Sequence, residues 1–308
     1  MNIIVVGCGY HARKNILPLF KNEHFPFRLI GLQTRSKEKL GQISFVDKKV
    51  LRHYEWRALF NLTALDCVYV ALPNAMHFDV INFCSDRNLP IICEKSLIIP
   101  WSEQFEKLKK MKVRVFEAFM YRYHPLFDFY SELIKSKVSK IKCVRMKFEI
   151  PHLDNSNIRY SEKLGGGALL DVGAYVINAF LHYSQKPKLL KAQVNFSKLP
   201  VDIDGDAIFL DARGFNFCLS WGFGKEYANE ISVELEDYTL KSERFFSKDV
   251  TKRSIVRKIL KNSNSIVLKS FDPVNHFEKM FEQFHSEITL GKNSNILEIQ
   301  QMEMLDLI

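Results

Sequence analysis

The sequence predicts an α/β Rossmann domain over residues 1–120, followed by an α+β domain with an open, mainly antiparallel sheet over residues 121–308. In the first 120 residues, short apolar runs alternate with helix-like segments, which is typical of a parallel sheet. Between residues 190 and 235, strand-like segments follow one another without helices, which favours antiparallel pairing. The length of 308 residues fits two domains.

The first domain begins with a strand at 3–6, a β-branched run that suits burial on both faces. A turn containing two glycines and a helical stretch at 13–20 follow it. Further strands are predicted at 27–32, 67–72, 91–93 and 113–116, and helices at 77–86 and 102–111. Ser102 and Glu103 favour an N-cap with an acidic first turn.

The second domain starts with a helix at 126–135 and an alternating strand at 141–150. A glycine cluster at 165–167 precedes a helix at 168–183. Strands are then predicted at 190–196, 207–211, 215–221 and 230–235. A last helix, at 274–290, carries apolar side chains on one face, and this face can pack back on the first domain.

Composition limits the class of protein. With 47% hydrophobic and 26% charged residues, the chain can bury a core and is not of the disordered class. Six cysteines without a C-x-x-C pair predict buried, reduced thiols of a cytoplasmic protein and no metal site. Because the sequence has neither a signal-peptide pattern nor an apolar run of about 18 residues, we expect neither export nor membrane insertion.

The chain carries a net charge of +9, from 44 Lys and Arg against 35 Asp and Glu. This balance favours an anionic partner such as a phosphorylated small molecule, nucleic acid or a membrane surface. The most basic stretch, 248–269, contains seven Lys or Arg and one acid, Asp249. Since it has no nucleic-acid-binding motif, we expect a small-molecule partner, and the stretch suits either a phosphorylated substrate or a solvated face.

A dinucleotide fingerprint, Gly7-x-Gly9-x-x-Ala12, stands between the first strand and the first helix. There the glycines allow a tight turn and close approach of a pyrophosphate, which the free N–H groups of the helix start can bind. The predicted cofactor contacts in this turn are Gly7, Gly9, Tyr10, His11 and Ala12. The alternative is an ordinary strand-to-helix turn.

The residues after the second strand favour NADP(H) over NAD(H), with NAD(H) remaining possible. An NAD-selective fold places an acid there to bind the ribose 2′-hydroxyl, but no Asp or Glu occurs before Glu38. Arg35, flanked by Thr34 and Ser36, suits a 2′-phosphate. The alternative is a solvated basic loop.

Two further strands end in polar motifs, at the edge where open α/β sheets bind ligands. Leu72-Pro73-Asn74-x-x-His77 follows one strand, and Glu94-Lys95 follows the next. We expect all of these residues to line the cofactor site. A lysine placed there can exchange a proton with a substrate if burial lowers its pKa, whereas the alternative is a surface lysine.

Asp171 and Tyr175 form the last constellation, after the three glycines at 165–167. They are four residues apart, so on a helix they share a face, and the carboxylate can orient the phenol or a substrate hydroxyl. The alternative is a glycine turn that starts a helix, with Tyr175 as a core aromatic.

Together these residues resemble the Gfo/Idh/MocA family of oxidoreductases, in particular its glucose-fructose oxidoreductase and dihydrodiol dehydrogenase-like branch. The resemblance spans residues 1 to about 185 and consists of motifs in family order. These are Gly7-x-Gly9-x-x-Ala12, Pro73-Asn74-x-x-His77, Glu94-Lys95, residues 117–125, Asn157-Ile158-Arg159 and residues 165–175.

The resemblance implies a nicotinamide-binding Rossmann domain, a second domain whose open sheet often forms the dimer interface, and an active site between the two. Lys95 matches the lysine of the family's Glu-Lys-Pro motif, Asp171 matches its aspartate, and Tyr175 stands where many members have His. The chain departs from the family pattern at Ser96, which replaces the proline. This departure loosens the turn that aims Lys95.

The predicted function is that of an NAD(P)-dependent oxidoreductase acting on CH–OH groups. It transfers a hydride between nicotinamide and a secondary alcohol or ketone of a sugar, nucleotide-sugar or cyclitol. Lys95 and Tyr175 share proton transfer, Asp171 fixes the Tyr or a substrate hydroxyl, and Arg122 and Arg159 line the substrate side. The alternatives are a dihydrodiol- or imine-type reductase and a non-catalytic NADP(H)-binding regulator. We also expect a cytoplasmic homodimer or higher homo-oligomer.

Overall fold

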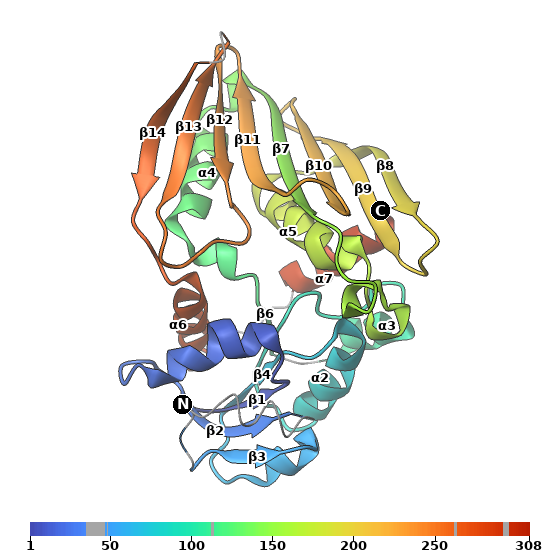
Figure 1. Cartoon of the computed structure of the whole chain (residues 1–308), viewed down its shortest axis with the longest axis vertical. Coiled ribbons are helices and arrows are strands. Elements are labelled where there is room, and N and C mark those ends of the chain that lie inside the picture. Colours follow the sequence, from blue (N-terminus) through green and yellow to red (C-terminus); the bar gives the residue numbers. More distant parts are fainter. Residues whose placement is uncertain (35–46, 48, 112–113, 262–263, 292–295) are drawn as a thin grey trace. The chain divides into compact units, whose positions relative to one another are not determined.

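The computed structural model describes residues 1–34, 47, 49–111, 114–261, 264–291 and 296–308. They form two compact units, each built on one sheet (Figure 1). The first unit contains Met1–Phe119 and Phe277–Gln300, and the second contains Met120–His276 and Gln301–Ile308.

The sheet of the first unit has six parallel strands in the order β3-β2-β1-β4-β5-β6. Three of these strands, β1, β4 and β5, are buried almost throughout, which explains why their sequences are continuous apolar runs. The strand order reverses between β1 and β4, and open α/β sheets bind ligands at such a point. The strands are β1 Asn2–Val6, β2 Arg28–Gln33, β3 Leu51–His53, β4 Cys67–Val70, β5 Ile91–Cys93 and β6 Val115–Glu117.

Helices α2 (His77–Ser85) and α3 (Glu103–Lys110) follow β4 and β5. The helix predicted at 13–20 is instead a π-helical turn, Ala12–Ile16, and a 3-10 turn, Leu17–Lys21, and a proline near the start of the second turn removes an N–H donor there. Ser102 precedes α3 as predicted, but its hydroxyl donates to the Ile99 carbonyl (2.6 Å) and does not cap the helix.

Helix α6 (His276–Thr289) belongs to the first unit from Phe277 onward. Its apolar face packs on aromatic side chains of the first unit, on β4, on β6 and in the segment before β2. The ring of Phe281 lies 5.5 Å from those of Phe25 and Tyr69, and the ring of Phe284 lies 5.5 Å from that of Phe116. The core of the first unit is therefore completed by residues from the far end of the chain.

The sheet of the second unit has eight strands in the order β14-β13-β12-β11-β7-β10-β9-β8. All neighbouring pairs are antiparallel except β7 and β10, which run parallel. The strands are β7 Ile141–Ile150, β8 Lys188–Phe196, β9 Asp202–Leu210, β10 Asn216–Phe223, β11 Ala228–Leu235, β12 Tyr238–Glu243, β13 Ser254–Leu260 and β14 Ser265–Phe271.

Strands β12, β13 and β14 are not among the predicted elements, and the last two overlap the basic stretch 248–269. All but the last residue of β14 is exposed, so its sequence lacks the apolar-polar alternation that identifies a half-buried strand. This edge strand therefore could not be predicted from the sequence pattern.

Helices α4 (Pro125–Ser136) and α5 (Ala174–Tyr183) pack on one face of this sheet, and α7 (Ile296–Leu307) closes the chain. Phe180 of α5 stacks near Phe209 of β9 (4.3 Å between ring centroids), and the Tyr130 hydroxyl of α4 donates to Ser242 of β12. The helical segment Glu162–Tyr183 is long and apolar enough to cross a membrane, but 78% of its most apolar window is buried inside the protein. It is therefore a core helix.

Candidate active site

The fingerprint turn of the first unit needs glycine at its first position. Gly7 has φ +97°, and a Cβ there would lie 2.4 Å from the Ala71 carbonyl oxygen. Gly9 differs, because a Cβ at that position would meet nothing within 4 Å. The turn thus leaves open space beside the backbone, as the close approach of a pyrophosphate requires. These residues fit a dinucleotide.

Gln33, at the end of β2, holds this turn in place, and sequence reasoning did not assign it a role. Its Oε1 accepts the Gly7 N–H (3.0 Å) and its Nε2 donates to the Tyr54 carbonyl (2.9 Å). The next residue, Thr34, is buried. Arg35 and Ser36, which the sequence predicts as 2′-phosphate ligands, lie outside the described residues.

Glu94 lies in a polar cluster at the carboxyl end of β5. The Tyr69 hydroxyl donates to its Oε1 (2.6 Å), and Nε2 of His11 lies 3.1 Å from the same oxygen. Burial by itself raises the pKa of Glu94, but His11, Tyr69 and Lys95 lower it by more, so the pKa is below its usual value. Glu94 is therefore a mostly buried carboxylate that connects the fingerprint turn to the Glu-Lys motif.

His77 connects two turns that the sequence predicts to face the cofactor. Its side chain is fully buried, with Nε2 2.8 Å from the Leu72 carbonyl and Nδ1 3.0 Å from the Ser96 carbonyl. Burial lowers the pKa of His77 despite these carbonyl contacts. Since both ring nitrogens face backbone oxygens, its position suits holding the turns together. Pro73 and Asn74 lie at the start of the same segment, and both are partly exposed.

Lys95 follows Glu94 and is partly exposed. The peptide bond between Lys95 and Ser96 is cis, and Ser96 is buried. The next amide, Leu97 N–H, donates to a carboxylate oxygen of Glu117 (2.9 Å) at the end of β6. The residues that follow Lys95 are thus fixed by a buried hydrogen bond, which limits where the lysine side chain can lie.

In the second unit, the glycines at 165–167 allow two backbone segments to touch. A Cβ on Gly166 would lie 2.4 Å from the Arg159 carbonyl oxygen, and the Gly167 N–H donates to that oxygen (2.8 Å). The contact brings Arg159 beside the helix start, where its Nε donates to Oδ2 of Asp171. Asp171 raises the pKa of Arg159, and Tyr175 does so to a smaller extent. The structure therefore groups three predicted site residues: Arg159, Asp171 and Tyr175.

Tyr175 lies at the start of α5, with 7% of its surface exposed. Its hydroxyl lies 3.7 Å from the sulfur of Met120, and its ring packs near those of Tyr121 and Phe148. The residues before it, Leu169–Gly173, form a π-helical turn where a continuous α-helix was predicted. The side chains of Asp171 and Tyr175 still share a neighbour in Arg159.

Two sets of positioning groups around this helix were missed by sequence reasoning. Asp202 accepts the Leu169 N–H (2.7 Å), and burial raises its pKa to about 6. The side chain of Gln301 donates to the Ala174 carbonyl and accepts from Asn178, which in turn accepts from Tyr121. These contacts could not be predicted from the sequence, because the residues that make them are far apart in the chain.

Arg122, predicted on the substrate side, is partly exposed and lies near Tyr123 and His182. Burial, with a smaller effect of Arg122, lowers the pKa of His182 to about 4. The contacts given for Arg122 therefore do not connect it to the group formed by Arg159, Asp171 and Tyr175.

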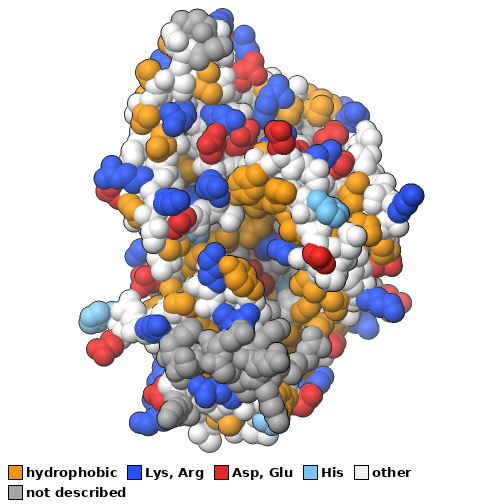
Figure 2. Space-filling view, viewed as in Figure 1, with side chains coloured by type: hydrophobic (Ala, Val, Ile, Leu, Met, Phe, Trp, Pro, Cys, Tyr) orange, Lys and Arg blue, Asp and Glu red, His pale blue; other side chains and the backbone are white. Residues whose placement is uncertain are grey.

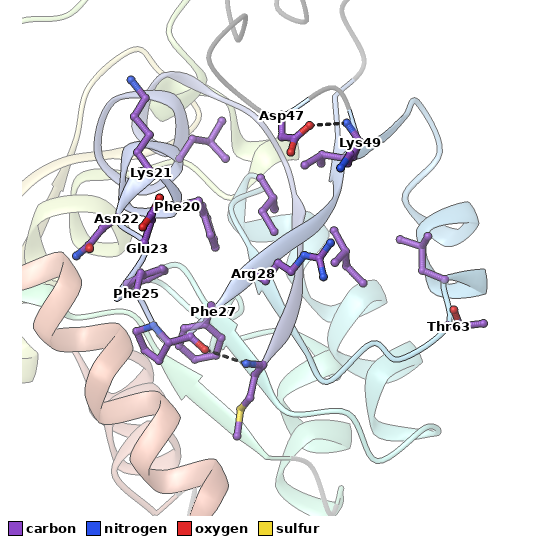
Figure 3. Close-up of a pocket in the computed structure, with 17 residues that line it drawn as sticks. Phe20, Lys21, Asn22, Glu23, Phe25, Phe27, Arg28, Asp47, Lys49 and Thr63 are labelled. Carbon is purple, nitrogen blue, oxygen red and sulfur yellow. Dashed lines mark hydrogen bonds between the residues drawn. The ribbon is translucent and has the colours of Figure 1, made fainter.

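A cavity of about 710 Å³ opens elsewhere in the first unit (Figure 3). Its lining includes Met1, Phe27 and Arg28, at the amino ends of β1 and β2. Gly7 and Gln33 lie at the opposite, carboxyl ends of these strands, so this cavity is separate from the fingerprint turn.

Comparison with known proteins extends these observations. A family model for an oxidoreductase family with an NAD-binding Rossmann fold matches residues 1–119. The NADP(+)-dependent D-xylose 1-dehydrogenase 2 of Haloferax volcanii is 26% identical over 246 residues, 78% of this chain and 75% of the relative. A dTDP-3,4-didehydro-2,6-dideoxy-α-D-glucose 3-reductase of Actinomadura kijaniata is 25% identical over 297 residues, 94% of this chain and 88% of the relative.

Solved structures share the whole fold. A 3-ketoreductase from Actinomadura kijaniata, in complex with NADP and TDP-benzene, matches with a TM-score of 0.89 and 22% identity, covering 100% of this chain and 96% of the other. An aldose-aldose oxidoreductase from Caulobacter crescentus matches with a TM-score of 0.84 and 18% identity over the same shares. The predicted fold class, a Rossmann domain followed by a mainly antiparallel α+β domain, is confirmed.

Proposed function

We propose that the chain is an oxidoreductase of the Gfo/Idh/MocA family, whose Rossmann-domain model matches residues 1–119, and that it transfers a hydride between NADP(H) and a sugar-like substrate. The reacting carbon is a secondary alcohol or ketone of a sugar, nucleotide-sugar or cyclitol. The relatives named for D-xylose and for a dTDP-sugar support this substrate class. A cytoplasmic homo-oligomer is part of the same proposal.

The observation that carries the proposal is the pairing of Arg159 with Asp171 beside Tyr175. A buried phenol next to a fixed ion pair is suited to donating a proton to a developing alkoxide. Tyr175 contributes to the raised pKa of Arg159, so the phenol and the ion pair are close enough to interact. The second support is Lys95, at the carboxyl end of β5 beside the point where the strand order reverses.

The residues of the first unit suit binding of the cofactor. The backbone of Gly7 and Gly9 would hold the pyrophosphate, and Thr34, Arg35 and Ser36 would hold the 2′-phosphate. When bound, the nicotinamide supplies or accepts the hydride. Glu94 fixes the position of the fingerprint turn relative to Lys95 through its contacts with His11 and Tyr69.

The chain's own residues then handle the proton. In the reducing direction, the ammonium of Lys95 polarises the carbonyl, and the Tyr175 hydroxyl gives its proton to the oxygen as the carbon receives the hydride. Solvent returns a proton to the phenolate afterwards. The Arg159–Asp171 pair orients Tyr175 and a substrate hydroxyl, and Arg122 contributes to substrate binding. In the oxidising direction the same proton moves from alcohol to Tyr175.

A dihydrodiol-type reaction is the second candidate. A trans-1,2-dihydrobenzene-1,2-diol dehydrogenase of Xenopus laevis is 24% identical over 181 residues, 57% of this chain and 54% of the relative. The same lysine and tyrosine chemistry serves that substrate class, so activity on diols and on sugars should be compared directly.

The decisive test is the Lys95→Ala variant. We expect it to lose about a hundredfold or more in kcat, because general acid–base groups contribute about that much, while its NADPH affinity changes little. Titration with NADPH and NADH in parallel measures binding, and a panel of sugars, nucleotide-sugars and diols measures turnover. A variant that keeps a tenth of the wild-type kcat, or a wild type that binds neither cofactor, contradicts the proposal.

A further inference from the structure

A second cavity, of about 200 Å³, lies in the second unit where β12 ends and β13 begins. Six cationic side chains line it: Lys241, Arg244, Lys248, Lys252, Arg253 and Arg257. The acidic side chains in the lining are Glu243 and Asp249. Figure 2 shows Lys and Arg side chains over this part of β12 and β13. The cavity contains much of the basic stretch that the proposed reaction leaves unexplained.

Lys241 and Arg257 place part of the cavity on the face of the sheet opposite the helices, and Ser254 also lines it. Ser242 and Ser254 point toward α4, since Ser242 accepts from Tyr130 and Ser254 lies 3.4 Å from Nε2 of His124. Lys241 and Ile255 alternate with these serines and therefore point to the other face. Among the described residues, those that line the cavity include neither Tyr175 nor any other residue of α5.

Two cations stand directly opposite each other at this site. Lys241 of β12 is the register partner of Arg257 of β13, and like charges in such a pair destabilise a sheet. Lys241 is compensated by Glu230, at 2.7 Å. Among the described residues, no carboxylate lies within ion-pair distance of Arg257. Arg244 is likewise without an acidic partner in the described chain, and its guanidinium lies 5.0 Å from the Tyr227 ring centroid.

Lys248 adds a cation at the inner end of the cavity. Although part of its side chain remains exposed, its ammonium is enclosed by protein and donates to the Phe245 carbonyl. Burial lowers the pKa of the nearby imidazoles of His124 and His276, and Lys248 lowers both further. Burial lowers the pKa of Lys248 to about 7. Within the described residues this amine has no carboxylate partner.

We propose that this cavity binds the phosphate group of a small anionic metabolite, at a site separate from the dinucleotide turn and from Tyr175. Arginine guanidinium groups match phosphate oxygens in pairs, and Arg244 and Arg257 supply two that no carboxylate in the described chain occupies. Glu230 already compensates Lys241, and a phosphate beside Arg257 supplies the negative charge that Arg257 and the ammonium of Lys248 lack in the described chain.

The two ion pairs at the rim are compatible with this role. Lys252 lies 4.0 Å from Asp249, and Arg253 lies 2.8 Å from Asp272, with both pairs largely in solvent. Exposed pairs of this kind contribute about 1 kcal/mol or less, so their cations can turn toward a bound anion. The volume of the cavity suits a phosphate with a small organic group, and a polymer is not expected to enter it.

The test is a calorimetric titration of the full chain with inorganic phosphate and with pyrophosphate in an anion-poor buffer. We expect Arg257→Ser and Arg244→Ser each to raise the Kd at least tenfold. The matched control is Lys258→Ser, on the neighbouring position of β13, whose ammonium lies 4.3 Å from the Tyr238 ring centroid and not in the cavity. Thermal unfolding of each variant confirms that it is folded.

The titration is repeated with saturating NADPH, which separates this site from the fingerprint turn. Persistence of phosphate binding with NADPH bound supports the proposal, whether or not the chain proves to be an oxidoreductase. Loss of binding under NADPH, an unchanged Kd in both arginine variants, or no binding by the wild type overturns it. Displacement of phosphate by a short single-stranded oligonucleotide at lower concentration than pyrophosphate also overturns it, in favour of nucleic acid.

Discussion

At the scale of single residues, Glu94 is a mostly buried carboxylate whose charge depends on its neighbours. His11 belongs to the fingerprint turn, and its Nε2 lies 3.1 Å from Oε1 of Glu94, while Asn15 contacts the other ring nitrogen (3.2 Å). Without the imidazole, the carboxylate is left close to the turn that binds the pyrophosphate. Repulsion between the two anions then opposes cofactor binding.

We therefore predict that His11→Ala raises the Kd for NADPH about tenfold, which corresponds to about 1.4 kcal/mol. The double variant His11→Ala/Glu94→Gln should recover most of this loss, because the uncompensated charge is gone. Fluorescence titration measures both, and Asn15→Ala is the control that removes only the second contact. A double variant that binds no more tightly than His11→Ala shows that charge is not the cause.

Tyr175 distinguishes a chemical from a structural role for the start of α5. Phe keeps the ring and its packing on Tyr121 and Phe148 but removes the hydroxyl. We predict that Tyr175→Phe lowers kcat about a hundredfold or more with little change in Tm, because the contact it loses is a weak one to the Met120 sulfur. Both quantities are measured on the same preparation. Normal turnover would assign Tyr175 to the core.

At the scale of elements, the helix that carries Asp171 and Tyr175 depends on Asp202 at its start. The pKa of Asp202 is raised from 3.8 to about 6 by burial, although the N–H groups of Leu169 and Ala168 lower it in part. A folded-state pKa above the unfolded one means that the folded state binds the proton more tightly. The resulting stability is complete below about pH 4 and is lost as the pH rises through 6.

We predict that Asp202→Asn abolishes the loss of folding stability between pH 5 and 7.5. The amide oxygen still accepts the Leu169 N–H but has no proton to release, so the variant should gain roughly 1–1.5 kcal/mol of stability relative to wild type between pH 5 and 7.5. Urea unfolding at the two pH values measures the difference. Asp206→Asn on the same strand is the control. An equal pH dependence in wild type and Asp202→Asn would mean that the Asp202 proton does not cause the loss.

At the scale of the whole molecule, the chain passes between its two units three times, after Phe119, His276 and Gln300. The second passage brings α6 into the first unit, where Phe281 is fully buried against Phe25, Phe27 and Tyr69. The nucleotide-binding unit therefore depends on residues encoded after the second sheet.

We predict that Phe281→Ala costs about 3–5 kcal/mol of stability, as do other large-to-small changes of buried aromatic residues. The loss should be local, with faster hydrogen exchange in β1 and β4 and little change in β9 and β10. Glu282→Ala, on the exposed side of the same helix, is the control. Equal acceleration of exchange in both sheets would mean that the units unfold together.

The local features of this protein could be predicted from its amino-acid sequence. The parallel sheet was predictable because strands buried on both faces are continuous apolar runs, and the fingerprint because Gly7 needs a backbone conformation that other residues avoid. Asp171 and Tyr175 were singled out by their spacing, and their catalytic role, which the family resemblance implies, stays a prediction. The predicted extents of β1, β2, β4, β5 and β6 agree with the observed ones to within two residues at each end, for the same reason.

Features that depend on residues far apart in the sequence could be identified only from the tertiary structure. The pairing of Arg159 with Asp171 needs the close contact that Gly166 permits, and the charge of Glu94 needs His11 and Tyr69. The edge strand β14 was not predicted because nearly all of it is exposed and it has no apolar alternation. Interactions within one turn or strand follow from residue type and spacing, whereas these arise only when folding brings separate segments together.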